Sequence, residues 1–220
     1  NQAAAAGRVW LAKRPAPINP RDVLSFAEAL ADAGSDEAHA FIEKMRATQA
    51  GEAATIEALL RVRQGRPDEA AAALLAAYTA FRSDAWPLAR VQLRSFDLAV
   101  EILGARPGHT TPFFDALKTG PFPGYLMEAA RRQMLVRLEL RRWQNGEGTT
   151  NIGYALLEPW GFWTGDYLKS RYTFYKRTGL GDAVRARREL ESFLESDTSP
   201  FDRDLEPAKP ATPPAATAAR

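Results

Sequence analysis

The alanine-rich stretch QGRPDEAAAALLAAY, residues 64–78, constrains the fold more than any other part of this sequence. It opens with a turn, Gly65-Arg66-Pro67, whose proline fits the first turn of a helix. Asp68 and Glu69 follow, where negative charge is favourable at a helix N-terminus. Apolar residues then recur at helical spacing, at Ala70, Leu74, Ala77 and Tyr78. The stretch therefore predicts a turn followed by a helix.

Small side chains in this helix indicate close packing. A methyl group at a helix crossing lets the two axes approach, while larger residues beside it fill the flanks. The preceding helix offers two leucines on one face. We therefore expect an antiparallel hairpin whose buried contact involves Leu59, Leu60, Ala70, Leu74 and Ala77.

Helical stripes separated by Gly- or Pro-containing turns run through most of the chain. One helix is expected to begin at Asn19-Pro20, because Asn accepts a hydrogen bond from a free N–H group and Pro fits the first turn, and to close at Gly34. The other expected core-facing stripes are Leu24, Ala27, Leu30 and Ala31; Ala38, Phe41, Ile42 and Met45; Met127, Ala130, Met134 and Leu138; Leu168, Tyr172 and Tyr175; and Val184, Leu190, Phe193 and Leu194. With few strand-like patterns, the sequence predicts an all-α array of antiparallel helical hairpins.

Two segments between residues 88 and 117 carry more specific predictions. Residues 88–103 contain two apolar stripes, which predicts a helix covered by neighbours on two sides. The second of these stripes consists of Leu93, Phe96, Val100 and Leu103. Thr111-Pro112 predicts the cap of a short helix that runs through Leu117.

Residues 145–165 lose helical periodicity and are rich in glycine and aromatic residues. Leaving Trp160, Phe162 and Trp163 in water would forfeit a large apolar gain, so we expect an ordered loop docked near Tyr172 and Leu138. Two interpretations stay open. These aromatic side chains either anchor the loop to the helices by packing on them, or line a binding site. In the second case Trp160, Trp163 and Arg171 are the expected partner-binding residues.

The ends of the chain differ in composition from its middle. Residues 1–18 include the proline-rich KRPAPINP and are expected to form a linker or docking segment. Residues 199–220 are rich in proline and alanine and are expected to be mobile, which leaves one helical-repeat domain over 19–198. Because the sequence does not begin with Met, we expect a piece of a longer protein or a processed product.

The segment from Gln64 to Ala70, with Ala77 seven residues on, resembles the centre of a tetratricopeptide repeat. A shorter version occurs at Gly34-Ser-Asp-Glu-Ala38, about one repeat earlier, and a looser one begins at Tyr175. The resemblance implies degenerate helical hairpins and a protein-binding role. Glu57 and Arg61 depart from the pattern, because the family has a large apolar residue and an aromatic residue there.

A fainter resemblance concerns Pro17-Ile-Asn-Pro-Arg-Asp22-Val-Leu-Ser-Phe26, which is similar to a segment near the end of the spermidine-synthase catalytic fold. Some bacterial proteins of that kind carry helical C-terminal extensions. This resemblance implies that the chain is the C-terminal accessory domain of a larger aminopropyltransferase, whose catalytic part it lacks.

Little in the sequence indicates catalysis. There is no cysteine, and the two histidines, His39 and His109, lie where structural roles are expected. Motifs for zinc proteases, calcium loops, phosphate loops and serine hydrolases do not occur. We therefore expect no catalytic residue, no cofactor and no bound metal.

Arginines crowd the helix over 124–143 and the last helix, and the sequence allows two interpretations of them. The favoured one is a solvated face paired with Glu128, Glu139, Glu189 and Glu191 at helical spacing. The other is an anionic-partner surface that includes Arg131 and Arg132.

The formal net charge of +2 counts against a nucleic-acid partner. No apolar run is long enough to span a bilayer. We therefore expect a cytoplasmic, non-catalytic helical module that binds a protein partner or its own missing domain.

Overall fold

The structure is a computed structural model that describes residues 5, 8–9, 12–13, 19–158 and 161–196. The expected linker, apart from five residues, and the whole expected tail lie outside the described residues. The described part is helical and contains no strand, which confirms the all-α prediction. The chain divides into two compact units, one up to Glu158 and one from Pro159 onward.

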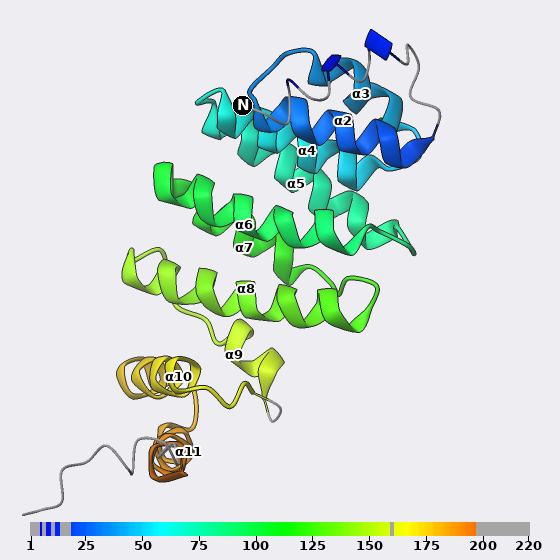
Figure 1. Cartoon of the computed structure of the whole chain (residues 1–220). Helices are drawn as coiled ribbons and strands as arrows, with labels where there is room; N and C mark the ends of the chain where they lie inside the picture. The colour runs from blue at the N-terminus through cyan, green and yellow to red at the C-terminus, as the bar shows by residue number, and fades with distance from the viewer. Residues whose placement is uncertain (1–4, 6–7, 10–11, 14–18, 159–160, 197–220) are drawn as a thin grey trace, which may run out of the picture. The chain divides into compact units, whose positions relative to one another are not determined.

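Residues 19–158 of the first unit form eight α-helices and one short 3-10 helix, shown in chain order in Figure 1. They are α2 (Pro20–Asp32), α3 (Ala38–Arg46), α4 (Ala50–Arg63), α5 (Pro67–Ser83), α6 (Ala89–Ala105), η1 (Pro107–His109), α7 (Thr110–Lys118), α8 (Tyr125–Gln144) and α9 (Ile152–Leu157). The second unit contains α10 (Gly165–Thr178) and α11 (Ala183–Ser196), which pack against each other.

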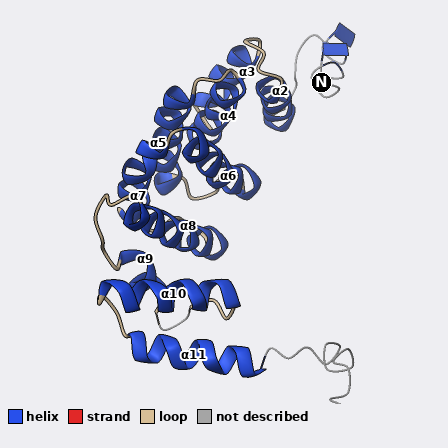
Figure 2. Ribbon diagram, turned by 90° about the vertical axis from the view of Figure 1, so that its left-hand side faces the viewer, coloured by secondary structure: helices blue, strands red, loops and turns tan. Residues whose placement is uncertain are grey.

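Helix α4 is the centre of the first unit. It packs against α2, α3, α5 and α6, and Figure 2 shows it between α5 on one side and α2 and α6 on the other. Nine of its residues, among them every position from Gly51 to Ile56, are buried. A helix that is covered on all sides cannot line an open groove, so α4 serves as the core element around which the others are arranged.

The predicted helix ends at Asn19, Gly34 and Gly65 are confirmed. The Asn19 side chain accepts a hydrogen bond from the Asp22 amide, at 3.0 Å. Gly34 and Gly65 adopt positive φ angles of 68° and 72°. The N–H groups of each glycine and of the residue after it donate hydrogen bonds to carbonyl oxygens in the last turn of the helix. Glycine suits these positions because side chains disfavour that conformation.

The predicted contact between α4 and α5 is also confirmed. Leu59, Leu60, Ala70, Leu74 and Ala77 are all fully buried. Helices α4 and α5 pack against each other, and both contribute fully buried alanines and leucines, so the alanine-rich sequence serves close packing.

We expect Ala70→Leu to lower the free energy of unfolding by about 2 kcal/mol, because three extra carbons would enter a filled helix crossing. Ala72→Leu is the matched control, since Ala72 is exposed on the same helix. Thermal and urea unfolding of both variants would measure the difference. Equal stability of the two would show that Ala70 does not lie at a crossing.

Two predictions around α6 and α7 are wrong. Leu93 and Val100 are 38% and 45% exposed, so the second stripe of α6 is covered only at Phe96 and Leu103. Helix α6 packs against α4, α5 and α8, and these neighbours leave Leu93 and Val100 exposed. Thr111 does not cap α7, which begins one residue earlier after the 3-10 turn; its hydroxyl instead bonds to Glu147.

Two further predictions need correction. The expected loop over 145–165 is interrupted by α9, which packs on α8. On α11 the expected core residues Val184 and Leu194 are about 60% exposed, and Ala186 is the buried one. Within the described residues of the second unit, α10 is the helix that packs on α11, and it covers a narrow face of it.

Candidate partner-binding surface

The arginines of α8 mostly bond to other helices of the first unit. Three of them donate to carbonyl oxygens in the last turns of α7, α9 and α6: Arg131 to Leu117, Arg132 to Leu156 at 3.1 Å, and Arg141 to Leu103 at 2.6 Å. Carbonyl groups at helix C-termini lack helical partners and carry partial negative charge, so cations are favourable there. These side chains therefore stabilise the fold.

Arg131 and Arg132 share the carboxylate of Glu128. The Nε atoms lie 2.6 and 2.8 Å from its two oxygens, which confirms the pairing predicted from helical spacing. Burial acts to raise the pKa of Glu128, but hydrogen bonds from both arginines outweigh it and leave that pKa lowered. Arg131 is 3% exposed, so its guanidinium is occupied inside the protein and is not a surface anchor.

Glu139 does not pair with an arginine in the way its spacing suggested. Its buried carboxylate accepts a hydrogen bond from the Thr150 hydroxyl. It also accepts hydrogen bonds from the backbone N–H groups of Ile152, Gly153 and Tyr154, with N···O distances of 2.9, 3.0 and 3.4 Å. These amides are the unpaired donors at the start of α9. Burial raises the pKa of Glu139, and the same hydrogen bonds oppose that shift.

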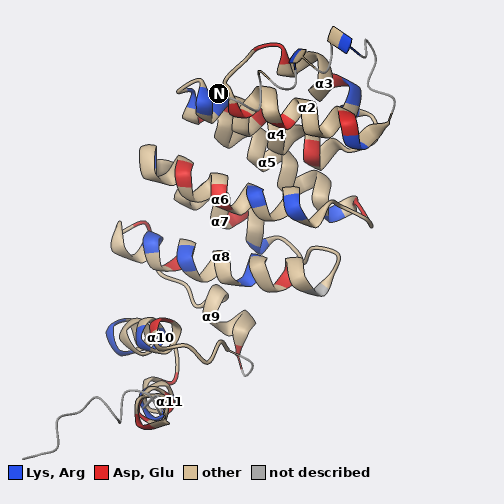
Figure 3. Cartoon of the chain, in the orientation of Figure 1, with Lys and Arg blue, Asp and Glu red and all other residues tan. Residues whose placement is uncertain are grey.

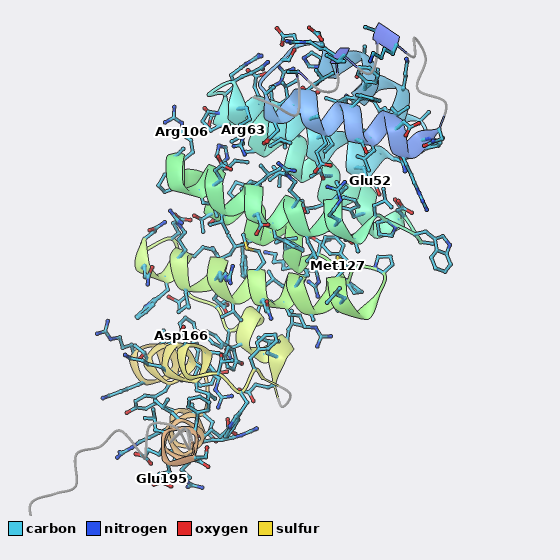
Figure 4. All side chains as sticks on the ribbon, viewed as in Figure 1. Glu52, Arg63, Arg106, Met127, Asp166 and Glu195 are labelled. Atoms are coloured by element: carbon cyan, nitrogen blue, oxygen red, sulfur yellow. The ribbon has the colours of Figure 1, made fainter. Side chains whose placement is uncertain are left out.

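Glu52 makes a similar contact at the start of α6. It is 1% exposed, and its Oε1 accepts the Leu88 amide at 2.7 Å. Figure 4 shows Glu52 and Arg63 at opposite ends of α4. Sequence reasoning missed both glutamate caps, although an acidic residue among buried helical positions is a signal that it needs a partner.

The candidate residues of the second unit are also engaged internally. Arg171 is 2% exposed and forms an ion pair with Glu189, so it does not present a surface. Trp163 is 54% exposed and packs edge-on against Phe193, with ring centroids 6.3 Å apart. Trp160 lies outside the described residues. Docking of this loop near Leu138 stays a prediction.

The histidines contact charged neighbours in the first unit. His39 Nδ1 lies 3.4 Å from Glu57, which pairs with Arg61 at 2.6 Å. His109 Nε2 lies 2.8 Å from Asp68, and this hydrogen bond lowers the pKa of that exposed carboxyl. Glu57 and Arg61 therefore form a charged pair on α4 that His39 joins.

Ion pairs join α2 to α6 across α4, and Figure 3 shows the charges along these helices. Arg90 and Arg94 each lie 2.6 Å from Oε1 of Glu28, and Arg94 lies 3.2 Å from Asp32. From α4, Arg63 lies 3.1 Å from Asp32 and 2.8 Å from Glu101 of α6. We call these six residues the α2–α6 clasp.

An exposed apolar stripe lies next to the clasp on α6. Leu93 and Val100 are seven residues apart and so share one face of the helix. Leu88, at the start of the helix, is 38% exposed. On α8, Leu126 is 61% exposed. These four residues are the strongest candidates for a surface that contacts another molecule.

Within the described residues, no group of three His, Asp or Glu side chains is placed to hold a metal ion. None of the described helices has the length and apolarity needed to cross a membrane. No family model, no curated protein and no solved structure matches this chain.

Proposed function

We propose that this chain is a non-catalytic array of helical hairpins that binds a protein partner through the exposed face of α6. The observation that carries the proposal is the stripe of Leu93 and Val100, which stays open to solvent although Val91, Leu98 and Ile102 on the other side of α6 are buried. Single exposed apolar residues are common, but aligned ones on a rigid helix indicate a contact surface.

The surroundings of the stripe support the same proposal. Asp97 lies on the same exposed face of α6, and the exposed Arg137 lies on α8. A contact surface with an apolar centre and a polar edge is typical of protein interfaces. Arg131 and Arg171, by contrast, are buried and form ion pairs within the chain, so we do not propose them as partner-binding residues. Trp163 keeps its place there as an exposed aromatic residue.

A photo-reactive amino acid at Val100 tests the proposal in cells of the source organism. We expect one discrete cross-linked product with this variant and none with the same group at Ala72, an exposed position on α5. Equal cross-linking at both positions, or none at either, would contradict the proposed surface. Identification of the product as an aminopropyltransferase-like catalytic domain would favour the second proposal, that the chain is an accessory domain of such an enzyme.

A further inference from the structure

The α2–α6 clasp covers an apolar face of α4. Ile56 lies seven residues before Arg63 on that helix, so the two share one face. Arg63 connects Asp32 of α2 with Glu101 of α6, which places this face between the two helices. Ile56 is fully buried, as is Ala53 three residues earlier on the same side of the helix. The clasp therefore lies over apolar surface.

The contacts of the clasp are of a kind that salt weakens. The side chains of Arg90 and Arg94 are 63% and 30% exposed, and both compete for one oxygen of Glu28. Salt screens ion pairs between exposed groups. An isolated pair of this kind contributes little, but several charges joined in one network, as in the clasp, contribute more. The contact between α4 and α5 consists mainly of fully buried apolar side chains, with one ion pair, Arg61 to Glu69 at 3.7 Å, so salt weakens it less.

We propose that the clasp is a salt-sensitive closure over α4. With the clasp intact, α2 and α6 cover Ile56. When screening or loss of Glu28 breaks the ion pairs, the two helices separate locally and uncover this apolar face, while the hairpin of α4 and α5 stays folded. The inference does not depend on the proposed function, because it concerns contacts within the chain.

The absence of cysteine makes a direct test possible, since any introduced thiol is unique. Ile56→Cys, and independently Ala53→Cys, would be labelled with a maleimide in about 0.01 M and about 1 M salt, which shortens the Debye length from about 30 Å to about 3 Å. We expect labelling of each to accelerate about tenfold at high salt. The added substitution Glu28→Gln should produce a similar acceleration at low salt.

Three controls separate opening of the clasp from other effects. Ala77→Cys, buried between α4 and α5, should stay protected in every condition. The exposed Ala72→Cys should react quickly throughout, which checks the reagent. Glu43→Gln removes an ion pair with Arg46 that is confined to α3 and should change nothing. The proposal would be overturned if neither salt nor Glu28→Gln changed the labelling rates of Ile56→Cys and Ala53→Cys. It would also be overturned if these rates rose together with the labelling rate of Ala77→Cys.

Discussion

Replacing Gly153 with alanine should lower the free energy of unfolding by about 3 kcal/mol, the largest effect expected of a single methyl group in this chain. A Cβ atom at this position would lie 2.9 Å from the Val136 amide nitrogen and 3.0 Å from the Leu135 carbonyl carbon. These are backbone atoms within α8, so they cannot move aside as the end of a side chain can. The helices α8 and α9 would have to separate.

Gly104 provides the matched control for this prediction. It is a helical glycine on the exposed face of α6, and a Cβ atom there would meet nothing within 4 Å. Gly104→Ala should therefore stabilise the chain by about 0.5–1 kcal/mol, because alanine restricts the unfolded chain more than glycine does. Urea unfolding followed by circular dichroism would measure both. Opposite signs are expected, and a neutral Gly153→Ala would show that α9 does not pack closely on α8.

Replacing Glu139 with alanine should cost about 3 kcal/mol, because the Thr150 hydroxyl and the amides that start α9 would lose their acceptor in a buried place. Glu139→Gln should cost less, since it keeps one acceptor oxygen. The exposed Glu195→Ala, on α11, should stay within about 0.5 kcal/mol of the unchanged chain.

The pH dependence of the Glu139→Ala effect provides a second measurement. Burial raises the pKa of Glu139 in the folded chain above its unfolded value. The folded state then binds the proton more tightly, so this group adds stability as the pH falls through the folded pKa and loses that contribution as the pH rises. The cost of Glu139→Ala should therefore be larger in acid than at neutral pH. A cost that shrinks on acidification would mean that the hydrogen bonds outweigh burial.

Local sequence signals predicted the helices well because their causes are local. Asn19 accepts a hydrogen bond from an amide in the first turn of α2, and Gly34 adopts a backbone conformation that other residues disfavour. Ala70 is buried in a hairpin whose two helices are neighbours in the sequence. The α9 segment was missed because six residues show too little periodicity, and its helix is fixed by Glu139 from another element.

The candidate surface was harder to predict than the fold. Arg131 and Arg171 had the composition of interface anchors, but which arginine turns inward depends on helix ends that are distant in sequence. Leu93 and Val100 had the pattern of a core stripe, but the helices that pack on α6, which are α4, α5 and α8, leave them exposed. Periodicity identifies an apolar face, whereas tertiary packing decides whether that face is covered.

The caps made by Glu52, Glu139 and the arginines of α8 bear on how this architecture can change over evolution. In an array of self-contained repeats, each hairpin satisfies its own helix ends, so copies can be gained or lost one at a time. Here a glutamate of α4 caps the N-terminus of α6, and arginines of α8 cap the C-terminal ends of α6 and α7. Excising or duplicating one hairpin would leave unpaired backbone groups in its neighbours. The helix ends of this unit therefore depend on one another, and repeat-like sequence within it does not mark self-contained modules.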